Sequence, residues 1–315
     1  GLVGIGICLV ASATHSFAVT TGKAWHVERQ SLFLAIDLAL VIFSLRFDYR
    51  LLKDIATPLY VFNIILLLAV MFLGHSQLGA QRWIQIGPLS IQPSEFSKAI
   101  MIVCLAAFLN KRLETLDSFT DYLPALAYAF VPFILVMKQP DLGTSLVFMA
   151  ILLGMLLISG FKVRWLMYMS GALIALMPAL WHILKEYQKN RIRVFLDPEL
   201  VIQSKIAIGS GLLTGKGWFL GTQSQLNFLP ENHTDFIFAV AGEEFGFIGI
   251  FIILLLYLIV IWRGLTIALN AEDDFGTLLA VGITFMFMFH VLVNIGMTAG
   301  VMPVTGVPLP FMSYG

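Results

Sequence analysis

Two carboxylates and an imidazole alternate where a polar stretch runs into an apolar segment, in the string FLPENHTDFIFAVAGEE. They belong to Glu231, His233 and Asp235, and an extended backbone would point all three side chains the same way. Such a set could hold a divalent cation such as Mg²⁺ or Mn²⁺. Asp235 by itself could act as a general base, or could cap the helix that follows it. The residues alone leave these alternatives open.

Two further carboxylates lie deeper in the same apolar segment. Glu243 and Glu244 follow Asp235 by eight and nine residues, which is roughly two turns of helix. A carboxylate at that depth is paired or protonated, because an unpaired charge in a membrane segment is costly. We count Glu244 and His233 among the candidate substrate-binding residues.

A second polar group, GAQRWIQIGPLSIQPSEFSK, precedes another apolar segment. Glu95 and Lys98 are three residues apart, so they share a helical face and could form a local ion pair. Charges inside a membrane segment cost about 2.5–3.5 kcal/mol each, which favours a cavity or a partner. We therefore expect Arg82, Glu95 and Lys98 to line an outward-facing pocket. Trp83 suits either the interfacial aromatic belt or a platform for substrate.

Other candidates are scattered along the chain. Asp141, in the string KQPDLGTS, is placed to cap a helix or to contact substrate. Lys205 and Lys216 carry positive charge along the longest polar stretch. The glycine-rich run GSGLLTGKG lacks the spacing and the Ser or Thr of a P-loop, which excludes that nucleotide site. His290 and Asn294 share one face of the last apolar segment, where helix packing explains them.

The composition indicates what must position these residues. Hydrophobic residues make up 59% of the 315 residues and charged ones only 12%, with a mean hydropathy of +0.89, whereas soluble domains carry about 25% charged residues. The net charge of zero gives no basic field for nucleic acid. Cys8 and Cys104 are too far apart for a CxxC metal or redox pair. The composition therefore indicates membrane lipid as a partner.

The hydropathy pattern predicts an all-α polytopic membrane protein. Crossing the hydrocarbon takes about 20 mostly apolar residues, and only a helix then satisfies its own backbone. We predict a single transmembrane domain over 1–315, with one long polar loop at 185–235. The predicted spans are 1–19, 29–45, 55–73, 95–110, 122–137, 142–160, 165–184, 236–262 and 276–297.

The basic residues of the short connections predict the orientation. Eight of them fall on alternate loops, which the positive-inside rule places in the cytoplasm, so the long loop faces outward. These residues are Arg46, Arg50, Lys53, Lys111, Arg112, Lys162, Arg164 and Arg263.

The strings above, together with GVPLPFMSYG near the end of the sequence, resemble the SEDS family. The resemblance covers nearly the whole chain and is closest to the rod-shape branch, with the cell-division branch as its paralogue. It implies the SEDS fold in the bacterial cytoplasmic membrane, with about nine transmembrane helices present of an expected ten. It also implies that the family continues past Gly315, and that about ten residues are missing between Glu199 and Leu200, which would then not be bonded.

The resemblance further implies an activity. It predicts a peptidoglycan glycosyltransferase that polymerises lipid II at the outer face during cell elongation, releases undecaprenyl pyrophosphate and works with a class B penicillin-binding protein similar to PBP2. Asp235 matches the family's essential aspartate, the proposed general base. Arg82, Lys98, Lys205 and Lys216 are our candidates for binding the leaving pyrophosphate, unless a divalent cation does so. The alternatives are a lipid II flippase and a non-catalytic scaffold for a penicillin-binding protein.

Overall fold

The computed structural model describes residues 1–15, 19, 25–77, 80–86, 89–139, 141–169, 171, 175, 199–226, 228–229 and 231–314. Packing divides the described residues into two compact units. The first unit contains those of Gly1–Phe47, Ile183–Ile261 and His290–Gly315, and the second those of Asp48–His182 and Trp262–Phe289. The single transmembrane domain stays a prediction.

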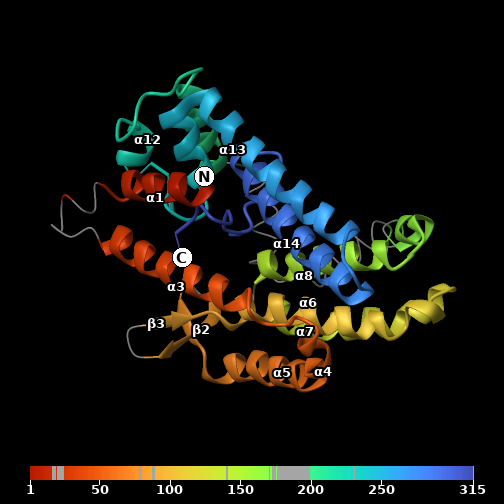
Figure 1. Ribbon diagram of the computed structural model, residues 1–315. Coiled ribbons are helices and arrows are strands. Elements are labelled where there is room, and N and C mark those ends of the chain that lie inside the picture. Colours follow the sequence, from red (N-terminus) through yellow and green to blue (C-terminus); the bar gives the residue numbers. More distant parts are fainter. Residues whose placement is uncertain are drawn as a thin grey trace. The chain divides into compact units, whose positions relative to one another are not determined.

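Apolar helices occupy the predicted segments wherever the structure describes them (Figure 1), which confirms the helical class. Among the described residues, α6, α7, α13 and α14 are long and apolar enough to cross a membrane, and α1, α5 and α8 are shorter apolar helices. The segment 165–184 lies largely outside the described residues, so the count of nine stays a prediction. The helices are α1 (Leu2–Ala13), α3 (Trp25–Ser44), α5 (Ala56–Leu73), α6 (Pro93–Asn110), α7 (Phe119–Lys138), α8 (Leu142–Ile158), α13 (Ile237–Leu269) and α14 (Asp274–Thr298).

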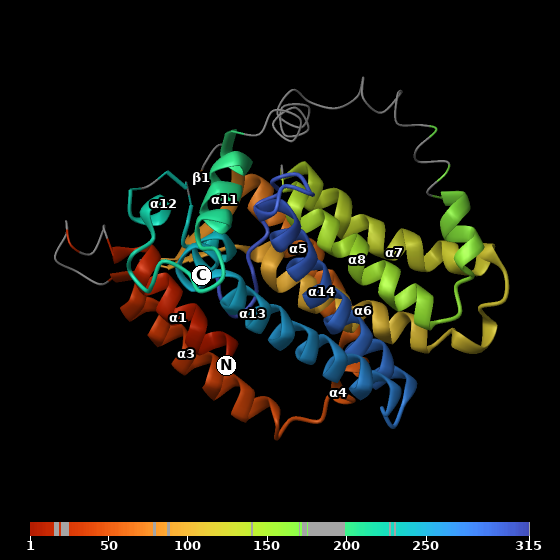
Figure 2. The same ribbon diagram turned by 90° about the horizontal axis from the view of Figure 1, so that it is seen from above.

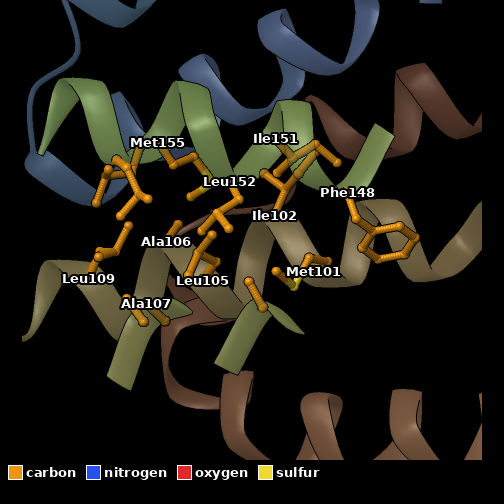
Figure 3. Close-up of a cluster of buried hydrophobic side chains, with 14 of the residues drawn as sticks. Met101, Ile102, Leu105, Ala106, Ala107, Leu109, Phe148, Ile151, Leu152 and Met155 are labelled. Atoms are coloured by element: carbon orange, nitrogen blue, oxygen red, sulfur yellow. The ribbon is translucent and has the colours of Figure 1, made fainter. Parts of the chain in front are cut away.

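The core of the second unit lies between α6, α7 and α8, which run side by side (Figures 1 and 2). Leu105 and Ile102 of α6 face Ile151 and Met155 of α8, and all four are fully buried (Figure 3). The same unit contains the short helix α4 (Leu51–Asp54) and the 3-10 turn η1 (Leu113–Thr115). This dense packing fixes the first turns of α6 and α8, where candidate site residues lie.

A small antiparallel sheet precedes α6, and the all-α prediction missed it. Its strands are β1 (His75–Gln77), β2 (Ala80–Ile86) and β3 (Leu89–Ile91), in the order β1-β2-β3. Residues Ile84 and Ile91 pair across β2 and β3, and β-branched side chains of this kind favour strands. Arg82 and Trp83 lie in β2, and the sheet leads into the start of α6.

The first unit places α1 beside α3 and packs α1 against the start of α13. It also contains α11 (Glu199–Ser210) and α12 (Thr222–Gln225), which lie within the predicted long loop. The expected break between Glu199 and Leu200 is wrong, because α11 begins at Glu199 and continues through Leu200 as one helix.

The helix α13 is broken at Gly246, where φ is 65° and ψ is −163°. A break in an apolar helix leaves carbonyls and N–H groups without their usual helical partners. The glycine-rich run supplies those partners. The N–H groups of Lys216 and Gly217 donate to the carbonyls of Glu243 and Glu244, at 3.0 and 3.1 Å.

The second half of α13 is satisfied by the same run of chain. Phe247 N–H donates to Leu212 O at 2.9 Å, and Ile248 N–H donates to Leu213 O at 3.1 Å. The backbones approach closely, so a Cβ added at Gly215 would lie 2.0 Å from Glu244 O. The glycines excluded as a P-loop thus cap the two half-helices of α13.

Gly215→Ala should lower the melting temperature of the purified protein. Gly215 has φ +81°, and a side chain in that region costs about 1–3 kcal/mol before the clash with Glu244 O is added. Gly209→Ala is the matched control, because Gly209 lies within α11 and an added Cβ meets nothing within 4 Å. We expect the control to stabilise the helix by about 0.5–1 kcal/mol. Equal melting temperatures for the two variants would contradict this account of the break.

Candidate active site

The structure divides the candidate residues between the two units. The first unit holds Asp235, His233, Lys205, Lys216 and Glu244. The second unit holds Trp83, Glu95, Lys98 and Asp141, and the backbone of Arg82 in β2.

Asp235 lies at the end of a tight turn that leads into α13. The carbonyl of Glu231 accepts the N–H groups of Thr234 and Asp235, at 3.2 and 3.1 Å. Glu231 itself has a positive φ of 48°. The extended backbone that would align Glu231, His233 and Asp235 on one cation is therefore wrong, because the chain turns back on itself here.

Asp235 is also not the N-cap of α13. The cap is the residue whose carbonyl accepts the first bonds of the helix. That residue is Phe236, which accepts the N–H groups of Ala239 and Val240 at 2.9 and 3.3 Å. Asp235 precedes it and is half-buried.

The described residues do not form a set of side chains that could bind a metal ion. No group of three or more His, Cys, Asp and Glu side chains comes together among them. A divalent cation such as Mg²⁺ or Mn²⁺ stays a prediction.

Three successive backbone carbonyls of the turn each accept a hydrogen bond from residues between Asn294 and Tyr314. Tyr314 N–H donates to His233 O at 2.9 Å, and Ser313 Oγ donates to Thr234 O at 2.7 Å. Asn294 Nδ2 donates to Asp235 O at 3.0 Å and to Val307 O at 2.8 Å. The sequence analysis found no role for Asn294 beyond helix packing, because Asp235 lies far from it along the chain.

Aromatic rings surround His233. Its imidazole lies 5.3 Å from the ring of His26 and 5.6 Å from that of Tyr314, measured between centroids. Burial lowers the pKa of His233, although Glu231 opposes the shift. The ring is therefore neutral at pH 7, where it can accept or donate a hydrogen bond without adding charge next to Asp235.

The two candidate lysines of the long loop, Lys205 and Lys216, differ in their surroundings. Lys205 is exposed on α11, and its side chain lies against Gly300, where an added Cβ would meet its Cε at 2.2 Å. Lys216 instead pairs with the fully buried Glu243 at 2.7 Å. Glu243 also accepts the N–H groups of Gln223 and Ser224 at the start of α12. This arrangement favours a structural role for Lys216.

Glu244 is buried beside α1. Ser12 Oγ donates to its carboxylate, and Gln225 Nε2 donates to Ser12 O at 2.9 Å. Only 1% of Glu244 is exposed. These contacts join α1, α12 and α13, so the structure surrounds Glu244 with protein groups.

The second unit brings Glu95, Lys98 and Asp141 to the starts of α6 and α8. Lys98 Nζ pairs with Glu95 at 2.8 Å, as in the first of the two alternatives, and Lys98 is almost fully buried. The substrate-binding role of both residues stays a prediction. Asp141 caps α8 as predicted, by accepting Thr144 N–H at 3.1 Å. Gln92 Nε2 donates to Asp141 at 2.9 Å, a link between the two helix starts that the sequence does not reveal. Trp83 is partly buried in β2.

Lys216→Met should lower the melting temperature, because it leaves the buried Glu243 without its counter-charge. Removing one partner of a buried pair costs about 3 kcal/mol or more. The double variant Lys216→Met with Glu243→Gln should recover most of that loss, because glutamine is uncharged and still accepts the N–H groups of Gln223 and Ser224. An unchanged melting temperature for Lys216→Met would show that the ion pair contributes nothing to stability.

Comparisons with known proteins agree with this architecture. The cell cycle protein family of FtsW, RodA and SpoVE matches residues 1–315. The peptidoglycan glycosyltransferase MrdB of Escherichia coli K12 is 42% identical over 316 residues, covering 98% of this chain and 85% of that protein. One solved structure, described as the structural coordination of polymerization and crosslinking by a peptidoglycan synthase complex, has a TM-score of 0.84 and 32% identity, and covers 100% of this chain and 91% of that one. The solved structure of an aspartate-to-alanine variant of the rod shape determining protein RodA from Thermus thermophilus has a TM-score of 0.74 and 29% identity. The match covers 100% of this chain and 87% of that one.

Proposed function

The chain belongs to the cell cycle protein family of FtsW, RodA and SpoVE, and we propose that, as a peptidoglycan glycosyltransferase, it polymerises lipid II with Asp235 as the general base. The observation that carries the assignment of Asp235 is its surroundings. Its backbone is hydrogen-bonded on both sides, to Glu231 and Asn294, while its carboxylate stays half-buried at the start of an apolar helix. A general base needs a fixed position and access to the substrate.

The reaction has two requirements at the reacting atoms. The 4-hydroxyl of one lipid II attacks the anomeric carbon of the growing strand, and undecaprenyl pyrophosphate leaves with inversion. A new glycosidic bond replaces the bond to pyrophosphate, and the hydroxyl proton passes to Asp235. Negative charge grows on the leaving pyrophosphate, so cations must lie close to it.

The candidate lysines differ in how well their surroundings suit binding of the leaving pyrophosphate. Lys205 is exposed on α11 in the same unit as Asp235, which supports it as a pyrophosphate ligand. Lys98 is buried and paired with Glu95, so binding there would require the pyrophosphate to share or displace that carboxylate. Lys216 is paired with Glu243, and we propose it with less support than Lys205.

The setting of the reaction is also a proposal. The basic short loops support a cytoplasmic membrane location with the polar loop on the outer face. A related structure is described as a complex that coordinates polymerization and crosslinking, which supports a class B penicillin-binding protein as the partner of this chain. Elongation rather than division is supported by the similarity to MrdB and RodA.

Asp235→Ala should abolish glycan polymerisation from purified lipid II in the presence of the cognate penicillin-binding protein. The control is Glu231→Gln, because Glu231 is an exposed carboxylate of the same turn. Its backbone carbonyl accepts the N–H groups that form the turn, and glutamine can still accept the long 3.4 Å bond that Thr234 Oγ1 donates to the side chain. We expect the control to keep wild-type strand synthesis on a gel of labelled product. Equal polymer from Asp235→Ala would exclude it as the base, and failure of the wild type would favour the flippase or the scaffold.

Lys98→Ala should also abolish polymerisation if its ammonium stabilises the departing pyrophosphate. Lys111→Ala, an exposed lysine at the other end of the same helix, is the control and should leave the rate unchanged. Membrane insertion and the elution profile on gel filtration are checked for both variants. Retained strand synthesis by a folded Lys98→Ala would refute the assignment.

A further inference from the structure

Asn294 makes a pair of hydrogen bonds that fixes its orientation. Its side chain is fully buried, and both of its bonds run from Nδ2, to Asp235 O and to Val307 O. Rotating the amide by 180° would point its oxygen at two carbonyl oxygens, which would repel it. Its Oδ1 finds no hydrogen-bond partner among the described residues. The residue therefore acts as a donor, and both amide hydrogens are used on backbone carbonyls.

These bonds complete the restraint on the backbone of Asp235. Its N–H is held by Glu231 O, and its carbonyl is held by Asn294. The two preceding carbonyls are held by Ser313 and Tyr314. With the peptide groups on both sides fixed, the direction of the Cα–Cβ bond of Asp235 is fixed as well.

The end of the chain also approaches the carboxylate itself. A Cβ added at Gly306, whose φ is +70°, would lie 3.5 Å from Asp235 Oδ2. Asn294 joins the two segments, because one of its bonds goes to Asp235 and the other to Val307, next to Gly306. The amide thus sets the distance between the carboxylate and the segment that borders it.

We infer that Asn294 is the positioning residue of the active site, and that it acts by holding the backbone of Asp235 in the geometry for proton abstraction. This inference rests on the proposed role of Asp235. A general base must lie within hydrogen-bond reach of the hydroxyl, and a displacement of about 1 Å costs up to roughly 100-fold in rate. Asn294 does not contact the reacting atoms, so its loss affects the chemical step rather than substrate binding.

The test compares Asn294→Ala with Asn63→Ala in steady-state polymerisation of lipid II with the cognate penicillin-binding protein. Asn63 is an equally buried asparagine in α5, and its side chain makes no hydrogen bond to the described residues. For Asn294→Ala we expect kcat to fall by about 10- to 100-fold with KM within about twofold of wild type. Asn63→Ala should change neither constant, so a general effect of removing a buried amide is controlled.

A second variant keeps the inference testable if Asn294→Ala does not fold. Asn294→Ala leaves the carbonyls of Asp235 and Val307 without this donor, which destabilises the fold. Ser313→Ala removes only the hydroxyl that donates to Thr234 O and accepts Leu309 N–H. We expect a fall in kcat of about three- to tenfold, again with KM unchanged.

The outcomes separate this inference from the proposed function. If Asp235→Ala is inactive and a folded Asn294→Ala keeps the wild-type kcat, the inference is overturned and the role of Asp235 stands. A rise in KM at constant kcat also overturns it, because Asn294 would then support binding. If Asn294→Ala does not fold, an unchanged kcat for Ser313→Ala overturns it. If Asp235→Ala retains activity, the assignment of the base fails first, independently of Asn294.

Discussion

Backbone hydrogen bonding in an apolar surrounding is the constraint on which the first unit depends. A regular helix satisfies all its inner N–H and carbonyl groups, but a break exposes several of them, and lipid offers no replacement. The break at Gly246 is stable because the chain from Leu212 to Gly217 supplies both donors and acceptors. These hydrogen bonds require the main chains to approach closely. This explains the glycines at Gly211, Gly215 and Gly246, where an added Cβ would lie under 2.5 Å from backbone atoms.

The same constraint shapes the turn that carries Asp235. Non-helical backbone next to an apolar helix must find partners, and here they come from Glu231 on one side and from residues 294–314 on the other. A structure that satisfies these groups also immobilises them. The bonds that satisfy this backbone also hold the residue that we propose as the general base, so the rigid part of the proposed site is its main chain, while Asp235 itself stays half-buried.

Local patterns in the sequence predicted what depends on local physics. Hydropathy located the long apolar helices but not α11 and α12, which lie in the predicted polar loop. Asp141 and the pair of Glu95 with Lys98 were found because their partners lie three residues away. The pairs that were missed are distant: Lys216 with Glu243, Ser12 with Glu244, and Asn294 with Asp235. Spacing along the chain carries no information on such contacts, and the hydropathy of the span 236–262 gave no sign of the break at Gly246. The sheet was missed because its strands are short and interrupted by turn residues.

Charge pairing changes how the basic residues of this chain are interpreted. The sequence offers Lys98, Lys205 and Lys216 as equivalent cations, but two of them already face a carboxylate in the structure. A buried pair is stable only while both charges are present, because the desolvated partner left behind is costly. Lys216 lies between the helix break and the start of α12, where Glu243 accepts backbone N–H groups as well. Its charge thus stabilises the loop that caps α13. Lys205 is more exposed than Lys216. Its position in the same unit as Asp235 makes electrostatic stabilisation of a departing anion compatible with an intact fold.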